Sequence, residues 1–190
     1  MKDAKNVYSV APQDVQNALN GVQAVVTDLD GTLYTKGDLA RRLVAHLWWA
    51  LPLILIDRLA RGAAWRWVVR TRWHQRIYLP TMARLIGHYC PVRNDVLELL
   101  LEAHRRELPI ALYSDYGAID AKLQALGIAP SLFTVMVSAP ELGARKPDPQ
   151  AAEQVLRLLN ANPANTLWVG DRDDTDGVAA RSIGATFMKV

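Results

Sequence analysis

Two carboxylates one residue apart follow a short apolar run near the start of the chain. Residues 25–32 read Val-Val-Thr-Asp-Leu-Asp-Gly-Thr, which places Asp28 and Asp30 at the end of a predicted strand over 23–28. Side chains at i and i+2 lie on the same face of a strand, and open α/β sheets bind ligands at the carboxyl ends of their strands. The pattern indicates phosphoryl chemistry, with one carboxylate as nucleophile and the other as its acid–base partner. The alternative is an ordinary strand-ending turn, since Asp and Gly are common in turns.

Three later stretches add polar residues of the kinds that such chemistry needs. A second apolar run ends in the hydroxyl of Ser114, and Asp115 follows it. Lys146 lies in a loop that neighbouring prolines stiffen. A further apolar run leads into the loop 170–177, where four aspartates crowd together, and such crowding is costly without a cation. Taken alone, Ser114 could cap a turn and Lys146 could be a solvated lysine.

Taken in order, these four stretches resemble the haloacid dehalogenase-like superfamily of phosphotransferases and hydrolases. The resemblance covers residues 25–177. The positions that match its four motifs are Asp28, Asp30, Gly31 and Thr32, then Ser114, then Lys146, and finally Gly170, Asp171 and Asp176. The resemblance implies a Rossmann-like parallel α/β sheet with helices on both faces, plus an inserted α-helical cap after the first strand.

The resemblance also implies a Mg²⁺-dependent phosphomonoester hydrolase that works through an aspartyl-phosphate. Asp28 would attack phosphorus, Asp30 would protonate the leaving oxygen and later deprotonate water, and Lys146 would offset the negative charge. The residues implied to bind the substrate phosphate are Gly31, Thr32, Ser114 and Asp115. The residues implied to hold Mg²⁺ are Asp28, Asp30 through its backbone carbonyl, Asp171 and Asp176. Asp174 is the alternative to Asp176 as the outer ligand.

The second carboxylate separates the reactions of this superfamily. A phosphatase needs an acid at Asp30 to protonate an alkoxide, whereas a dehalogenase releases halide and typically lacks an acid there. Dehalogenation is therefore disfavoured. A phosphomutase acting on a soluble sugar phosphate would use the same groups and remains an alternative. A further alternative is a catalytically idle protein whose cap binds a membrane or a partner.

Alternating strand and helix patterns flank a segment of different character. The chain has 190 residues, of which 51% are hydrophobic and 22% charged, typical of one globular core with an insertion. The predicted strands are 23–28, 109–114, 134–138, 166–170 and 185–189, and the predicted helices are 13–20, 94–107, 117–126, 150–160 and 176–183. This alternation predicts a parallel α/β domain. We assign residues 1–34 and 92–190 to the catalytic core and 35–91 to an inserted helical cap.

Composition sets the predicted cap apart. Residues 36–93 contain eleven Arg or Lys and two Asp, a net charge of +9, whereas the rest of the chain carries −6. The segment contains five of the six tryptophans, which are Trp48, Trp49, Trp65, Trp67 and Trp73. They are interleaved with the arginines Arg58, Arg61, Arg66, Arg70, Arg72 and Arg76. An apolar run over 43–56 is about 14 residues long, shorter than the ~20 that a spanning helix needs.

Two interpretations of this segment remain open, and a third is disfavoured. Its helices could bury their apolar residues against one another and the core, with the arginines solvated. They could instead lie on an anionic bilayer, with tryptophans at the headgroup level, and the substrate would then be an amphiphilic or lipid-linked phosphate. Nucleic-acid binding through the basic patch is not expected, because no recognisable nucleic-acid module is present. The substrate class is otherwise a phosphorylated small molecule, and the oligomeric state is not indicated.

The single cysteine and the N-terminal residues bear on location. Cys90 excludes an intramolecular disulfide and fits a reducing compartment. Residues 1–13 contain no apolar stretch of signal-peptide length. We therefore expect a cytoplasmic protein, associated with the inner face of the membrane if the cap meets lipid.

Overall fold

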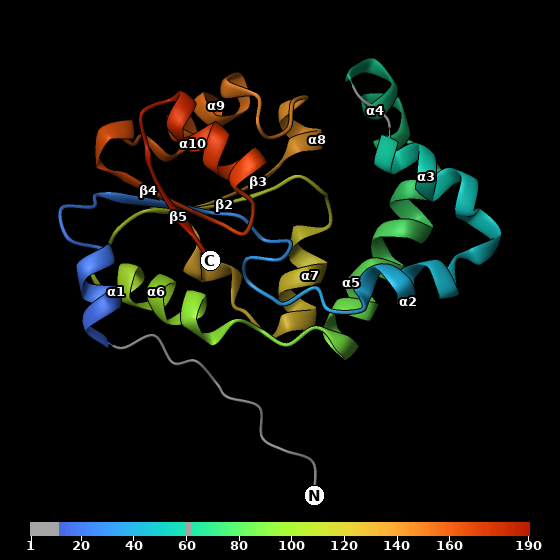
Figure 1. Cartoon of the computed structure of the whole chain (residues 1–190), viewed down its shortest axis with the longest axis horizontal. Helices are drawn as coiled ribbons and strands as arrows, with labels where there is room; N and C mark the ends of the chain where they lie inside the picture. The colour runs from blue at the N-terminus through green and yellow to red at the C-terminus, as the bar shows by residue number, and fades with distance from the viewer. Residues whose placement is uncertain (1–11, 60–61) are drawn as a thin grey trace, which may run out of the picture.

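Five parallel strands form a single sheet in the order β3-β2-β1-β4-β5 (Figure 1). The strands are β1 (Ala24–Thr27), β2 (Ile110–Ser114), β3 (Val135–Ser138), β4 (Thr166–Gly170) and β5 (Thr186–Lys189). The computed structural model describes residues 12–59 and 62–190. Each strand lies within the range predicted for it, or within one residue of it. The expectation about a signal peptide concerns residues 1–13, most of which lie outside the described residues.

Helices cover both faces of the sheet. They are α1 (Pro12–Ala18), α6 (Asn94–Arg105), α7 (Ile119–Leu126), α8 (Ala139–Leu142), α9 (Pro149–Leu159) and α10 (Val178–Ser182). Alternate residues of β1 supply the two cores: Val25 packs with residues of α1, α6 and α7, while Ala24 and Val26 pack with residues of α9 and α10. Strands buried on both faces are what parallel sheets require. The predicted Rossmann-like fold with helices on both faces is confirmed.

The remaining helices form a separate group beside the sheet, next to α7 (Figure 1). They are α2 (Leu39–His46), α3 (Leu51–Leu59), α4 (Gly62–Val69) and α5 (Leu79–Tyr89), and α5 packs directly on α7. We call residues 35–91 the helical insert. The chain leaves and re-enters the sheet domain at one place, because Tyr34 pairs with Val92 in an antiparallel bridge and Thr35 N–H donates to Pro91 O at 3.0 Å. This geometry supports our proposal that 35–91 is an inserted cap on a core of 1–34 and 92–190.

The apolar run over 43–56 is divided between two helices. Helix α2 ends at His46, and α3 begins at Leu51 with Pro52 in its first turn, where the missing N–H of proline costs no helical hydrogen bond. Among the described residues, no single helix is long and apolar enough to cross a membrane; α2 and the segment Trp48–Ile56 meet that test only together, and they are bent by 89°.

Candidate active site

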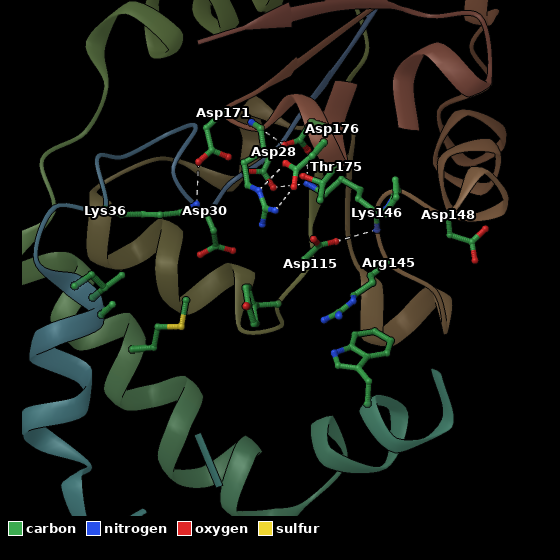
Figure 2. Close-up of a pocket in the computed structure, with 18 of the residues that line it drawn as sticks. Asp28, Asp30, Lys36, Asp115, Arg145, Lys146, Asp148, Asp171, Thr175 and Asp176 are labelled. Atoms are coloured by element: carbon green, nitrogen blue, oxygen red, sulfur yellow. Dashed lines mark hydrogen bonds and ion pairs between the residues drawn. The ribbon is translucent and has the colours of Figure 1, made fainter. Parts of the chain in front are cut away.

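The carboxyl edge of the three central strands brings the predicted site residues together. Asp28 and Asp30 follow β1, Ser114 ends β2, and Gly170 ends β4. Because β1 lies between β2 and β4, these chain segments meet at one edge of the sheet. Both aspartates are buried. Figure 2 shows them with Lys146, Asp171 and Asp176 around one cavity.

Asp28 is held by a lysine and a hydroxyl. One carboxylate oxygen accepts a hydrogen bond from Lys146 Nζ, and the other accepts one from Thr32 Oγ1 at 2.9 Å. Lys146 Nζ also lies 2.7 Å from Asp176 Oδ1. Burial raises the pKa of Asp28, and the charges of Asp176 and Asp30 raise it further, while Lys146 opposes them. A single lysine therefore does not fully compensate the buried carboxylates.

The carboxylates around Lys146 stabilise its charged form. Burial alone would lower the pKa of its ammonium, but the carboxylates of Asp28, Asp115 and Asp176 outweigh burial, and the pKa is raised. Lys146 is therefore a permanent positive charge in the site. The Asp115 carboxylate also fixes the lysine's backbone, since its Oδ1 accepts from Lys146 N at 3.1 Å.

Three carboxylates form a group that suits a hard divalent cation. Asp28, Asp171 and Asp176 each offer an oxygen, and these oxygens all lie within 4.8 Å of one another. Carboxylate oxygens are preferred ligands of Mg²⁺. Asp174, the alternative outer ligand, lies outside this group: its exposed carboxylate pairs with Arg172 at 2.5 Å. The residues present therefore fit a magnesium ion at Asp28, Asp171 and Asp176.

A wide helical turn positions Asp176. The sequence predicts an ordinary helix over 176–183, but a broader turn spans Asp173–Gly177 and leads into α10. Both Asp176 N and Gly177 N donate to Arg172 O, at 2.9 and 3.2 Å. The side chain of Asp176 then lies so close to Gly170 that a Cβ at that glycine would be 2.5 Å from the aspartate Cγ. Glycine at the end of β4 is required for this approach.

Asp30 sits in a network that the sequence did not reveal. Its carboxylate accepts hydrogen bonds from Tyr34 Oη at 2.6 Å, Ser114 Oγ at 2.7 Å, and Lys122 Nζ at 2.7 and 2.8 Å. Burial would raise the pKa of Asp30, but the Lys122 ammonium and the hydrogen bonds outweigh it and lower the pKa. A signal was present in the sequence: Lys122 occupies an inward position of the stripe Ile119, Lys122, Leu123, Leu126 on α7.

The residues predicted to bind phosphate lie around the same edge. Ser114 Oγ donates to Asp30 and accepts from Tyr116 N at 3.1 Å, which orients the loop after β2. Gly31 has a positive φ of 99°, and a Cβ there would be 2.4 Å from Asp171 Oδ2. Lys36, which the sequence analysis did not single out, donates to the same oxygen at 2.9 Å. The first and fourth motifs thus meet at Gly31.

We expect the Gly31→Ala variant to lower kcat/KM for phosphate release by about 10–100-fold, because the new methyl group must displace Asp171 from its place. The matched control is Gly127→Ala. Gly127 also has a positive φ, of 70°, but a Cβ there has no atom within 4 Å. Both variants place alanine at a positive φ, but only Gly31→Ala crowds a neighbouring side chain, so steady-state kinetics on the two variants separate these effects. Equal losses in the two variants would contradict this account.

The cavity has one polar wall and one largely apolar wall. Its volume is about 770 Å³. The sheet domain contributes the carboxylates and Lys146. The helical insert contributes Lys36, Gly37, Leu39, Ala40, Leu43, Trp65, Arg66, Tyr78 and Met82. Arg145 bridges the two walls, with its guanidinium carbon 5.4 Å from the centre of the Trp65 ring. A ligand that fills the cavity would therefore contact the insert as well as the acidic site.

The fold is an α/β fold whose candidate site lies at the carboxyl edge of a parallel sheet. The family model for haloacid dehalogenase-like hydrolases matches residues 22–184, and the chain belongs to this family. The predictions of this superfamily and of a hydrolase are confirmed. No curated protein matches the chain.

Solved structures of similar fold agree with this assignment. A HAD phosphatase from Thermococcus onnurineus has a TM-score of 0.68 at 20% identity, over 89% of this chain and 86% of that one. A predicted phosphoglycolate phosphatase from Haemophilus somnus gives 0.64 at 21% identity, over 89% and 85%. A putative beta-phosphoglucomutase from Thermotoga maritima gives 0.62 at 20% identity, over 88% and 85%. At these identities the likeness concerns the fold.

Proposed function

We propose that the protein is a Mg²⁺-dependent phosphomonoester hydrolase that forms an aspartyl-phosphate on Asp28. The observation that carries the proposal is the placement of Asp28, buried at the strand end between Lys146 and the carboxylates of Asp171 and Asp176. Family membership supports a hydrolase, and the similar folds include phosphatases.

The residues of the chain divide the reaction between them. Asp28 attacks phosphorus and displaces the alcohol oxygen, to which the protonated form of Asp30 donates its proton. The Asp30 carboxylate then takes a proton from the water that cleaves the acyl phosphate, which restores the protonated form. Lys146 stays charged and offsets the negative charge on phosphate and carboxylate. The phosphate oxygens are bound by the backbone amides near Gly31 and Asp115, helped by the hydroxyls of Thr32 and Ser114.

The proposed metal site completes the charge balance. Asp28, Asp171 and Asp176, with the backbone carbonyl of Asp30, would hold Mg²⁺, which supplies Lewis-acid neutralisation of the substrate phosphate when bound. The raised pKa of Asp28 supports this assignment, because burial and the carboxylates of Asp176 and Asp30 disfavour its ionised form more than Lys146 favours it, and a cation would offset them.

The apolar wall of the cavity favours an amphiphilic or lipid-linked phosphate as substrate. Leu43, Trp65 and Met82 of the helical insert face the cavity whose opposite wall holds the catalytic carboxylates. Such a site would bind the phosphate at one end and an apolar group at the other. The second candidate is a phosphomutase acting on a soluble sugar phosphate, which the similar fold of the putative beta-phosphoglucomutase favours.

The test is phosphate release from an aryl phosphate, with Mg²⁺ and with a chelator, followed by acid quenching and peptide mapping. We expect release that needs the metal, and a hydroxylamine-sensitive phosphate on the peptide that contains Asp28. Among alkyl phosphates, each methylene that the cavity buries should raise kcat/KM by up to about fourfold. Conversion of a sugar phosphate to its isomer without phosphate release would instead establish the mutase. A catalytically idle protein would show neither activity.

We further propose a cytoplasmic location. Cys90 is a free and buried thiol, which is compatible with a reducing compartment.

A further inference from the structure

The helical insert exposes many large apolar side chains on neighbouring segments. They are Trp48, Trp49, Leu51, Leu53, Leu55, Ile56, Leu59 and Trp67, and we call them the apolar face. Trp48 and Trp67 are each 69% exposed. The segments that carry them are neighbours, since α3 contacts both α4 and the turn Trp48–Ala50. Folded monomers rarely leave large apolar patches in water, and such patches mark binding surfaces.

Helix α3 shows that packing inside the chain does not account for the face. Its inner side is already buried, with Ile54 3% exposed next to the buried Ala50. Its outer side carries Leu51, Leu55 and Leu59 at spacings of four residues, all exposed. Apart from one Asp and one Arg near its end, α3 is apolar, and an apolar side of a helix is ordinarily covered by other parts of a protein. The interpretation that the cap helices bury their apolar residues within the protein therefore holds for one side only.

Positively charged side chains lie close in the sequence to Trp67 of the apolar face. The exposed arginines of α4 and of the segment that follows it are Arg66, Arg70, Arg72 and Arg76. Two of them flank Trp67, and Arg70 N donates to Trp67 O at 3.1 Å. Across residues 36–93 the net charge is +9, and the sequence there contains no glutamate. Arg61 belongs to the same stretch but lies outside the described residues.

The exposed apolar side chains and the nearby arginines together indicate which kind of partner fits this surface. A second copy of the chain would present the same positive charge, so electrostatic repulsion opposes self-association through this face. An anionic bilayer satisfies both features, because its headgroups attract arginine and its interface accommodates tryptophan and leucine. We infer that the apolar face of the helical insert docks on the surface of an anionic lipid bilayer.

Helix α4 connects this surface to the cavity. Trp65 and Arg66 line the cavity, whereas the next residue, Trp67, is exposed on the apolar face. Docking would therefore hold the cavity next to the lipid headgroups. The apolar face contains none of the residues that line the cavity, and among the arginines beside it only Arg66 does, so bilayer binding can be measured separately from the proposed hydrolase activity.

The test is flotation of the full-length protein with vesicles. One vesicle preparation contains phosphatidylcholine alone, and the other contains equal parts of phosphatidylcholine and phosphatidylglycerol. We expect about tenfold more protein to float with the anionic vesicles, and the difference to shrink as salt is raised. The double variant Trp48→Glu, Trp67→Glu should lose this binding while it keeps phosphate release from a soluble aryl phosphate.

Leu158→Glu is the matched control, because Leu158 is 56% exposed on α9 of the sheet domain. This variant should float like the wild type. Circular dichroism of each variant verifies folding. The inference is overturned if the wild type does not float, or if the double variant floats equally well. It is also overturned if the protein is a dimer without lipid and the double variant is a monomer, since the face would then belong to a second copy.

Discussion

The Lys122→Met variant is expected to lose much of its folding stability and most of its turnover. Lys122 is fully buried, and its ammonium lies 2.7 and 2.8 Å from the two carboxylate oxygens of Asp30. Removal of one partner from a buried ion pair leaves the other charge uncompensated and costs about 3–5 kcal/mol. Turnover should fall as well, because Asp30 is the proposed acid and base. Denaturant unfolding and phosphate-release kinetics at neutral pH measure the two losses.

The stability that Lys122→Met loses should depend on pH. In the wild type the pKa of Asp30 is lowered, so its stabilising contribution is present above the ordinary aspartate pKa and is lost as pH falls through the lowered value. Without Lys122, burial instead favours the protonated carboxyl, and the variant should lose stability as pH rises. The gap between the two proteins should therefore widen from acid to neutral pH.

Two further variants control this experiment. Adding Asp30→Asn to Lys122→Met should recover part of the lost stability, because the unpaired carboxylate is then absent. Lys189→Met, at the exposed end of β5, should change stability little. A stability gap that stays the same at every pH would show that Lys122 contributes through packing of its stem, and would contradict the ion-pair account.

Much of the fold could be predicted because its signals are local. Short apolar runs ending in Asp28, Ser114 and Gly170 indicated strands whose carboxyl ends face one site, and the pairing β2-β1-β4 places them there. The charge contrast between residues 36–93 and the rest indicated a distinct segment, which the structure shows as a helical group beside the sheet. Local sequence patterns were sufficient to predict where strands end and where the helical segment is inserted.

The missed features depend on contacts between distant residues. Lys122 and Asp30 are 92 positions apart, and Lys36 and Asp171 are 135 apart, so no local pattern identifies the aspartate that pairs with either lysine. An apolar stripe likewise does not say what covers it, which is why the exposure of α3 needed a structure. The wide turn before α10 depends on how closely Asp176 approaches Gly170.

The Asp28→Asn variant is expected to release no phosphate, yet to unfold at a higher temperature than the wild type in the absence of Mg²⁺. Activity is lost because an amide is not a nucleophile toward phosphorus. Stability rises because burial and the neighbouring carboxylates of Asp176 and Asp30 disfavour the ionised Asp28. Lys146 keeps a partner in the variant, since Asp176 lies 2.7 Å from its ammonium. Thermal unfolding with chelator, read beside the kinetics, tests both parts.

The sign of this stability change follows from the raised pKa of Asp28. A carboxyl that binds its proton more tightly in the folded state loses stability as pH rises from its ordinary pKa through the raised value. The advantage of the Asn variant should therefore be present at neutral pH and vanish in acid. Saturating Mg²⁺ should reverse the order, because the ion stabilises the protein that retains all three carboxylates. Asp173→Asn, in the exposed part of the same loop, should show none of these changes. An Asn variant that is less stable than the wild type with chelator at neutral pH would mean that Lys146 alone compensates the site, and the argument for a cation there would fail.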